Sequence, residues 1–142
     1  MPAPPVDARS ILTECVSVTP CGDDGVILRL RSEEALEPLR AARFFMLSAQ
    51  IPGFPKIPRP FSLYRQEGAD LEFLIKVMGR GTRALAGLSG GEVVRATGPL
   101  GNGWPELDEG THSVMLAGGI GSAPFFMAIE QALSGSHGPT LE

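Results

Sequence analysis

Four consecutive residues, Arg59-Pro60-Phe61-Ser62, combine a cation, a fixed backbone, an aromatic ring and a hydroxyl group. Proline lacks an N–H and fixes its own φ, so this segment is predicted to be extended at an edge or an opening of a sheet. Strand geometry then places Arg59 and Phe61 on one face. There the guanidinium could pair with a phosphate, the ring could pack on a planar heterocycle, and Ser62 could reach its polar edge. A buried Phe61 beside a solvated Arg59 is the alternative explanation.

Two glycine-containing turns further along the chain are also suited to an anion. In the segment 76–82, KVMGRGT, a predicted strand ends before a short predicted helix, and the junction contains Gly79, Gly81 and Thr82. Backbone amides at such a junction can converge on a phosphate. The sequence Gly118-Gly119-Ile120-Gly121 offers a similar approach between a strand and a helix. Any tight turn between a strand and a helix also requires glycine, so the second turn alone leaves phosphate binding open.

Short apolar runs separated by glycine or proline are typical of an antiparallel β domain. Strands are predicted near 10–18, 25–31, 43–49, 59–65, 70–78 and 92–97. In the fifth of these, Leu71, Phe73, Ile75 and Val77 would share one buried face. Six short strands predict a closed barrel, since closure removes exposed edges. A short helix near 82–89 would cover one end.

The pattern changes after residue 111. An apolar strand is predicted at 113–117 and a helix from about 122 to 133, with Ser122 as a candidate cap and Pro124 in the first turn. A strand that is apolar at every position suits a parallel sheet buried on both faces. We therefore expect the start of an α/β domain, which is completed by a partner or, as we favour, belongs to a longer chain.

These elements predict three divisions of the chain. They are a disordered proline-rich head at 1–8, a barrel domain at 9–108 and an incomplete α/β domain at 109–142.

Composition excludes several functions. The 142 residues are 43% hydrophobic, which is enough for one compact domain with a core. A formal net charge of −4, without a basic run, argues against nucleic acid or a membrane surface as the main partner. No signal peptide or long apolar segment is recognised, so a cytoplasmic protein is expected. Two cysteines are too few for a disulfide framework and are predicted to be structural thiols.

Four motifs in order, RPFS, IKVMGRGT, GPLGNGW and AGGIGSAP, resemble the electron-transfer subunit of dihydroorotate dehydrogenase, within the ferredoxin reductase-like flavoproteins. They cover residues from about 59 to 124. The resemblance implies a mainly β fold, in which a six-stranded antiparallel Greek-key barrel binds FAD. The first βα unit of a truncated α/β domain, which would bind NAD(P)H, would follow the barrel.

The resemblance also implies roles for individual residues. No side chain is expected to act as an acid or base, because the chemistry belongs to the flavin. The residues implied to bind FAD are Arg59, Pro60, Phe61, Ser62, Leu74, Ile75, Lys76, Gly79, Gly81 and Thr82. Those implied to approach NAD(P)H, as electron donor or acceptor, are Gly118, Gly119 and Gly121.

The resemblance implies that electrons pass between NAD(P)H and an iron–sulfur or flavin partner, namely the catalytic dihydroorotate dehydrogenase subunit of pyrimidine biosynthesis. The cysteine cluster that holds a [2Fe–2S] centre in this subfamily has no counterpart in these 142 residues. That centre is therefore expected only in a missing C-terminal part, and this oxidoreductase chain is expected to be inactive alone. A subunit of another redox complex, such as a hydrogenase or an NADH:ferredoxin oxidoreductase, is an alternative. A non-catalytic barrel that binds a partner protein is another.

Overall fold

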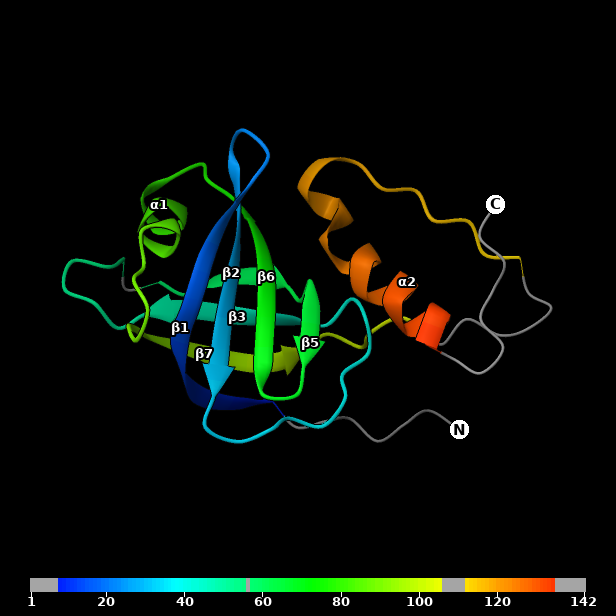
Figure 1. The fold of residues 1–142 in the computed structure, drawn as a ribbon, viewed down its shortest axis with the longest axis horizontal. Helices are drawn as coiled ribbons and strands as arrows, with labels where there is room; N and C mark the ends of the chain where they lie inside the picture. Colours follow the sequence, from blue (N-terminus) through cyan, green and yellow to red (C-terminus); the bar gives the residue numbers. More distant parts are fainter. Residues whose placement is uncertain (1–7, 56, 106–111, 135–142) are drawn as a thin grey trace.

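The computed structural model describes residues 8–55, 57–105 and 112–134. Seven strands form one antiparallel sheet in the order β4-β3-β7-β1-β2-β6-β5 (Figure 1). The strands are β1 (Arg9–Cys21), β2 (Gly25–Ser32), β3 (Phe44–Ala49), β4 (Arg59–Ser62), β5 (Arg65–Glu67), β6 (Asp70–Lys76) and β7 (Val93–Leu100). The helices are α1 (Arg80–Ala86), the short 3-10 helix η1 (Gly119–Ser122) and α2 (Ala123–Ser134). The predicted fold class, mainly β with an antiparallel barrel, is confirmed, although the curled sheet has seven strands where six were predicted.

The sheet curls because its two edge strands are consecutive in the chain. Only Leu63 and Tyr64 separate β4 from β5. The Leu63 amide donates to the Arg43 carbonyl at 2.9 Å, and the Tyr64 amide donates to the Glu72 carbonyl at 2.8 Å. This link therefore passes from the β3 side of the sheet to the β6 side. Neighbours that are distant in sequence, β1 with β7 and β2 with β6, give the crossed connections expected of a Greek key.

Alternation along the strands builds the core. In β6, Leu71, Phe73 and Ile75 are completely buried, as predicted, whereas the intervening residues are half-buried. Val77, predicted on the same face, follows the end of the strand and is only half-buried. The ring of Phe73 meets Phe45 of β3 edge to face, with 5.9 Å between the ring centroids. Because β3 and β6 are not neighbours in the sheet, this contact fills the space that the curled sheet encloses.

Several predicted boundaries shift. The predicted strand at 59–65 is divided into β4 and β5 by the link that closes the sheet. The last strand, β7, extends beyond 97 to Leu100, because Met46 and Phe44 of β3 pair along its length. The helix predicted near 82–89 begins earlier, at Arg80, directly after the Gly79 turn.

The strand predicted at 113–117 is wrong, because residues 112–118 form neither a helix nor a strand. A strand needs a neighbour for its backbone hydrogen bonds, and none of the described strands pairs with this segment. Val114 and Leu116 are consequently 76% and 88% exposed.

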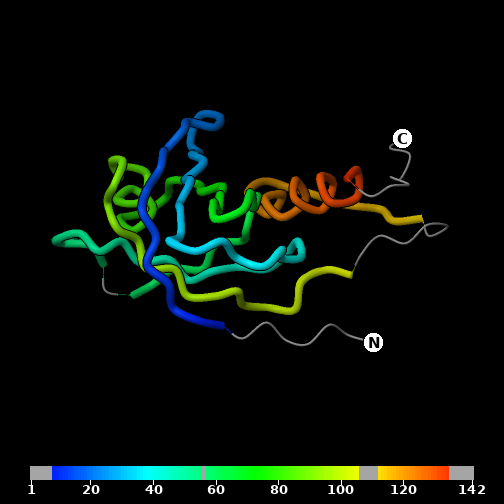
Figure 2. The backbone as a smooth tube through the Cα atoms, turned by 60° about the horizontal axis from the view of Figure 1, so that its bottom comes forward, coloured from blue at the N-terminus to red at the C-terminus, as the bar shows by residue number. Residues whose placement is uncertain are grey.

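The helix that follows agrees with the prediction. It begins at Ala123, and Pro124 lies in its first turn. The predicted cap Ser122 instead lies in η1, where its hydroxyl donates to the Gly119 carbonyl at 2.8 Å. Helix α2 lies beside β5, at the side of the barrel away from α1 (Figures 1 and 2).

Two predicted divisions fall outside the described residues. All but one residue of the predicted head at 1–8 lie outside them, as does the predicted boundary between 108 and 109.

Candidate functional site

The guanidinium of Arg59 lies directly against Gly81 of α1. A Cβ atom at Gly81 would come within 2.5 Å of Arg59 Nε and 2.6 Å of Cζ, so the missing side chain permits this approach. Arg59 Nη1 also donates to the Ile57 carbonyl at 2.8 Å, which helps to orient the side chain. The structure thus brings together the two segments that were predicted separately to bind a phosphate.

The turn before α1 leaves particular amides available. Thr82 Oγ1 accepts hydrogen bonds from the Met78 and Gly79 amides, both at 2.9 Å, and donates to the Gly79 carbonyl at 3.1 Å. The next amides, at 80–82, are the first of the helix, where helical geometry provides no carbonyl partner within the helix. These amides, with the Arg59 guanidinium beside them, can therefore face an anion. A pyrophosphate fits this donor set.

The other residues of β4 are arranged as an extended strand requires. Phe61 is half-buried and packs against the core, so its ring is covered only in part. Pro60 is exposed and Ser62 is half-buried. Since Arg59 and Phe61 alternate with Pro60, they belong to the same face of the strand.

The three predicted residues of β6 differ in what they can contact. Leu74 is half-buried on the face opposite the core. The side chain of Ile75 is completely buried in the core, so only its backbone is available to a ligand. Lys76 is exposed, and its Nζ lies 3.1 Å from Oδ2 of Asp24 in the turn between β1 and β2.

The glycine turn at 118–121 lies beside β6, although the two are far apart in sequence (Figure 2). A Cβ atom at Gly118, Gly119 or Gly121 would meet no atom within 4 Å, so the turn is open to approach. Gly119 has a φ of +56°, which favours glycine. The structure therefore brings the turn predicted to bind the dinucleotide next to the strand predicted to line the flavin.

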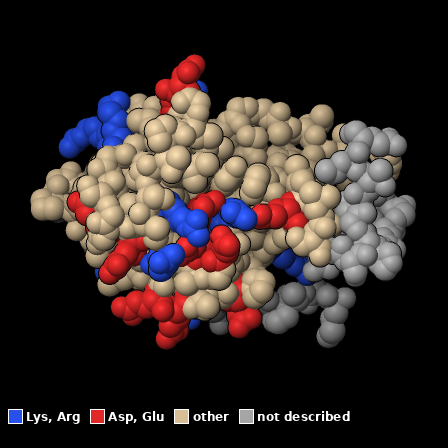
Figure 3. Space-filling view, viewed as in Figure 1, with Lys and Arg blue, Asp and Glu red and all other residues tan. Residues whose placement is uncertain are grey.

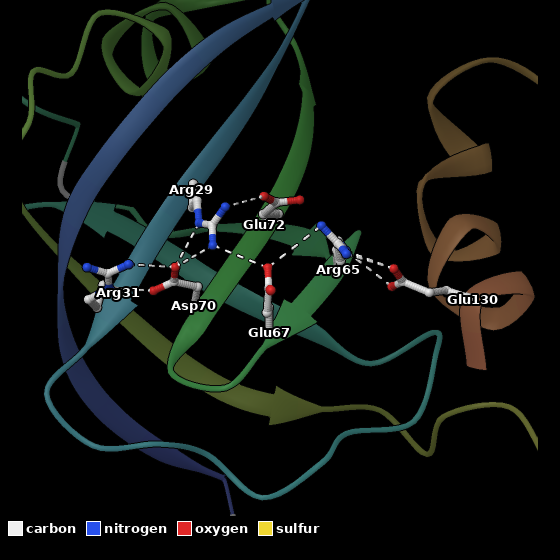
Figure 4. A network of polar contacts seen from close by, with 7 residues as sticks. All are labelled: Arg29, Arg31, Arg65, Glu67, Asp70, Glu72 and Glu130. Atoms are coloured by element: carbon white, nitrogen blue, oxygen red, sulfur yellow. Dashed lines mark hydrogen bonds and ion pairs between the residues drawn. The ribbon is translucent and has the colours of Figure 1, made fainter. Parts of the chain in front are cut away.

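Charged side chains form a row across the outer face of β2, β6 and β5, towards α2 (Figures 3 and 4). At its centre Asp70, which is 4% exposed, accepts from Arg31 Nε at 2.6 Å and from Arg29 Nε at 2.7 Å. The hydrogen bonds from Arg31 hold the pKa of Asp70 below its ordinary value, although burial opposes this. Each arginine of the cluster has a carboxylate partner. The cluster is therefore a stabilising network and not a ligand site.

Sequence reasoning missed Tyr64, Arg65 and Gln66, which contact α2 or the loop beside it. Burial raises the pKa of Tyr64 above its ordinary value, and the hydrogen bond that Arg65 donates to the Glu130 carboxylate raises the pKa of Arg65. Neither side chain therefore changes its charge near neutral pH. Their position shortly after RPFS, with only Leu63 between, was the one signal in the sequence that could have found them.

The two cysteines lie in different environments. Cys15 is buried and Cys21 is exposed. Burial raises the pKa of the Cys15 thiol, and the charge of Glu92 adds to the shift. Within the described segments, no three cysteine, histidine or acidic side chains are grouped to hold a metal. No helix in these segments has the length and apolar character needed to cross a lipid bilayer.

The chain is similar to known proteins both in sequence and in structure. No family model matches the chain. The chain is 34% identical over 103 residues to the electron transfer subunit of dihydroorotate dehydrogenase B (NAD(+)) from Clostridium acetobutylicum, covering 72% of this chain and 40% of that protein. The ferredoxin reductase in carbazole 1,9a-dioxygenase superimposes with a TM-score of 0.78 at 22% identity, over 92% of this chain and 41% of that one. An Amycolatopsis cytochrome P450 reductase gives a TM-score of 0.76 at 29% identity, over 89% and 40% of the two chains.

The chain therefore has the ferredoxin reductase-like fold, and its relatives are redox proteins. The resemblance read from the four motifs is also confirmed: the chain is related to the electron-transfer subunits of dihydroorotate dehydrogenase B. The chain spans 40% of the length of this relative from Clostridium acetobutylicum.

Proposed function

We propose that this chain holds FAD in an electron-transfer subunit like that of dihydroorotate dehydrogenase B. The contact between Arg59 and Gly81 carries the proposal, because it places a guanidinium beside the first turn of a helix, where the amides have no carbonyl partner within the helix. An arginine that only faced solvent would not require a glycine at position 81. The relationship to the electron-transfer subunits independently supports the same ligand.

Different residues would bind the pyrophosphate and the flavin ring of FAD. Arg59 and the amides at 80–82 would hold the pyrophosphate of FAD, with Gly79 and Thr82 shaping the turn. Phe61 would pack against the flavin, with Pro60 keeping the strand extended and Ser62 near the polar edge of the ring.

The remaining candidates lie on β6 and in the glycine turn. Leu74, the backbone of Ile75 and Lys76 would line the flavin from β6. Gly118, Gly119 and Gly121 would let NAD(P)H approach over the same strand. Bound flavin supplies hydride and single-electron chemistry. The chain's own residues bind and orient the two cofactors, and none needs to move a proton.

We further propose that residues from about 109 onwards begin a nucleotide-binding α/β domain. The exposure of Val114 and Leu116 supports this, since both side chains would be covered within such a domain. A [2Fe–2S] centre would be held by residues outside this chain, and the chain alone would be inactive in electron transfer.

The electron acceptor would be the catalytic dihydroorotate dehydrogenase subunit, and the protein would then act in pyrimidine biosynthesis. A second candidate is a reductase subunit of another redox complex, which the 29% identity to a cytochrome P450 reductase supports. Flavin-dependent reduction of each purified partner by NADH, with the protein in its full subunit, would distinguish the two.

Binding of FAD tests the proposal directly. The purified chain, reconstituted with FAD, is expected to show a flavin absorption spectrum after removal of free cofactor. Arg59→Ala is expected to weaken FAD binding by about 1.5–3 kcal/mol, because a charge-assisted contact is lost. Arg95→Ala is the matched control, since this arginine lies on β7 and bonds to Ser10 instead.

Two results would contradict the proposal at different levels. Equal FAD affinity in Arg59→Ala and the unchanged protein would remove Arg59 from the site. A colourless chain that cannot be reconstituted with FAD would instead favour the non-catalytic barrel that binds a partner protein.

A further inference from the structure

Two adjacent residues of the barrel hold α2 through contacts of different kinds. The ring of Tyr64 stacks on Phe126, with 4.7 Å between centroids and 19° between the planes. Next to it, Arg65 Nη2 lies 2.9 Å from Glu130 Oε1, and Arg65 Nε donates to the same oxygen at 3.0 Å (Figure 4). Phe126 and Glu130 are four residues apart, so they share one face of the helix. Attachment at two successive turns limits both rotation and sliding of α2.

A third attachment uses two glutamines. From the barrel, Gln66 Oε1 accepts from the Leu39 amide at 2.8 Å. From α2, Gln131 Nε2 donates to the Leu39 carbonyl at 2.6 Å, and its Oε1 accepts from the Ala41 amide at 3.3 Å. The loop around Leu39 is therefore hydrogen-bonded both to the barrel, through Gln66, and to α2, through Gln131. Three consecutive barrel residues, 64–66, thus hold the helix directly or through this loop.

Apolar burial alone does not fix the orientation of α2. The helix also buries small or flexible side chains, namely Ala123, Met127 and Ala128, together with Pro124. Such surfaces supply attraction that is not directional. The aromatic stack and the paired hydrogen bonds do depend on direction, as does the contact of Phe125 with Trp104, whose ring centroids lie 4.9 Å apart, so together they define where the helix lies.

We propose that Tyr64, Arg65 and Gln66 are positioning residues that fix α2, and with it the glycine turn at 118–121, against β6. The turn leads directly into α2, so a shift of the helix moves the turn. The contact of the turn with a nicotinamide cofactor rests on the proposed function. The position of the turn beside β6 is independent of that function.

The distance from the turn to β6 can be measured without any cofactor. In a Cys21→Ser background, Ser122→Cys provides one accessible thiol for a nitroxide label, because Cys15 is buried. The label should broaden the amide resonances of β6 in two-dimensional NMR spectra. Combining Arg65→Gln with Phe126→Ala should reduce this broadening about threefold or more, since the ion pair and the stack are both lost. Phe126 is 42% exposed, so its truncation leaves no core cavity.

Two further variants control the experiment. Glu67→Gln removes another carboxylate of the charged row, 3.8 Å from Arg65, but leaves Arg65 paired with Glu130, and should keep the broadening unchanged. Glu130→Gln removes the charge that pairs with Arg65 but keeps an oxygen acceptor of the same shape, and should give an intermediate loss that high salt reproduces in the unchanged protein.

The outcomes separate the two proposals. Full broadening of β6 in both the combined variant and Glu130→Gln would overturn the positioning role, because apolar burial would then suffice. FAD binding should stay within about twofold in the combined variant, since Arg59 and the turn at 79–82 are untouched. Absence of FAD binding in every variant, with broadening lost as expected, would contradict only the proposed function.

Discussion

Arg59 and Gly81 lie in contact between β4 and α1, with no side chain at position 81 to separate the guanidinium from the helix backbone. Each residue belongs to a short motif that is ambiguous alone. Their contact makes one site from two motifs, and it can be tested from either side.

Gly81→Ala should weaken FAD binding without weakening the fold. The new methyl group would meet Arg59 Nε at 2.5 Å, so the flexible arginine must move away. Alanine within α1 raises helix propensity, and thermal stability should rise by up to about 1 kcal/mol or stay unchanged. Calorimetry and FAD titration on the same sample check both effects. A stable variant with unchanged FAD affinity would contradict the role assigned to Arg59.

Thr82→Val should destabilise the turn before α1 by about 1 kcal/mol, because the Met78 and Gly79 amides lose their shared acceptor. Thr82→Ser keeps the hydroxyl and should retain most of the stability. Urea unfolding of the two variants provides the measurement. A loss of stability in Thr82→Ser with none in Thr82→Val would show that the methyl group of Thr82, and not its hydroxyl, is what the turn needs.

Asp70→Asn should lower the free energy of unfolding at neutral pH by about 1–3 kcal/mol, because two arginines lose a charged partner. The pKa of Asp70 is lowered in the folded state, so its stabilisation is present above the ordinary value of 3.8 and is lost as the pH falls below it. The difference between the two proteins should therefore be constant above about pH 5 and shrink in acid.

The exposed Glu14 of β1 provides the control for Asp70. Glu14→Gln should change the free energy of unfolding by less than about 0.5 kcal/mol at neutral pH. Urea midpoints measured from pH 7 to pH 3 compare the three proteins. A constant difference for Asp70→Asn throughout this range would show that its ionised carboxylate does not stabilise the fold.

Gly98→Ala should destabilise the barrel by about 1–3 kcal/mol, because the methyl group would meet the completely buried ring of Phe45 at 2.5 Å. Gly90→Ala is the matched control, since its nearest neighbours would lie 3.9 Å away. Thermal unfolding of both should separate crowding from a general effect of replacing glycine. Similar melting temperatures would indicate that β7 can move to relieve the contact.

Much of the barrel could be predicted because its strands carry local signals. Alternation in β6 gave the correct buried face, and glycine or proline marked where strands end. The division between β4 and β5 could not be predicted, because it depends on a link that bonds to two different strands. At 113–117 the apolar pattern indicated a strand, but a strand also requires a neighbour that the pattern does not reveal.

The candidate site also contains parts that local motifs predicted and parts that depend on tertiary packing. The residues of RPFS and of the turn before α1 were visible as motifs, and the fold brings Arg59 and Gly81 together. The burial of Ile75 followed from alternation, and it leaves only the backbone of Ile75 for the flavin contact that the motif implied. Contacts from Tyr64 and Arg65 to α2 depend on tertiary packing between distant segments, which no local pattern records.

The link of Leu63 and Tyr64 has a consequence for how the gene can vary. Ser62 ends the strand of the proposed flavin site, and Arg65 begins the strand that grips α2. One inserted or deleted codon between them would turn every later side chain of β5 to the opposite side. Substitutions can be tolerated here one at a time, but a change of length would damage cofactor retention and helix docking in a single step.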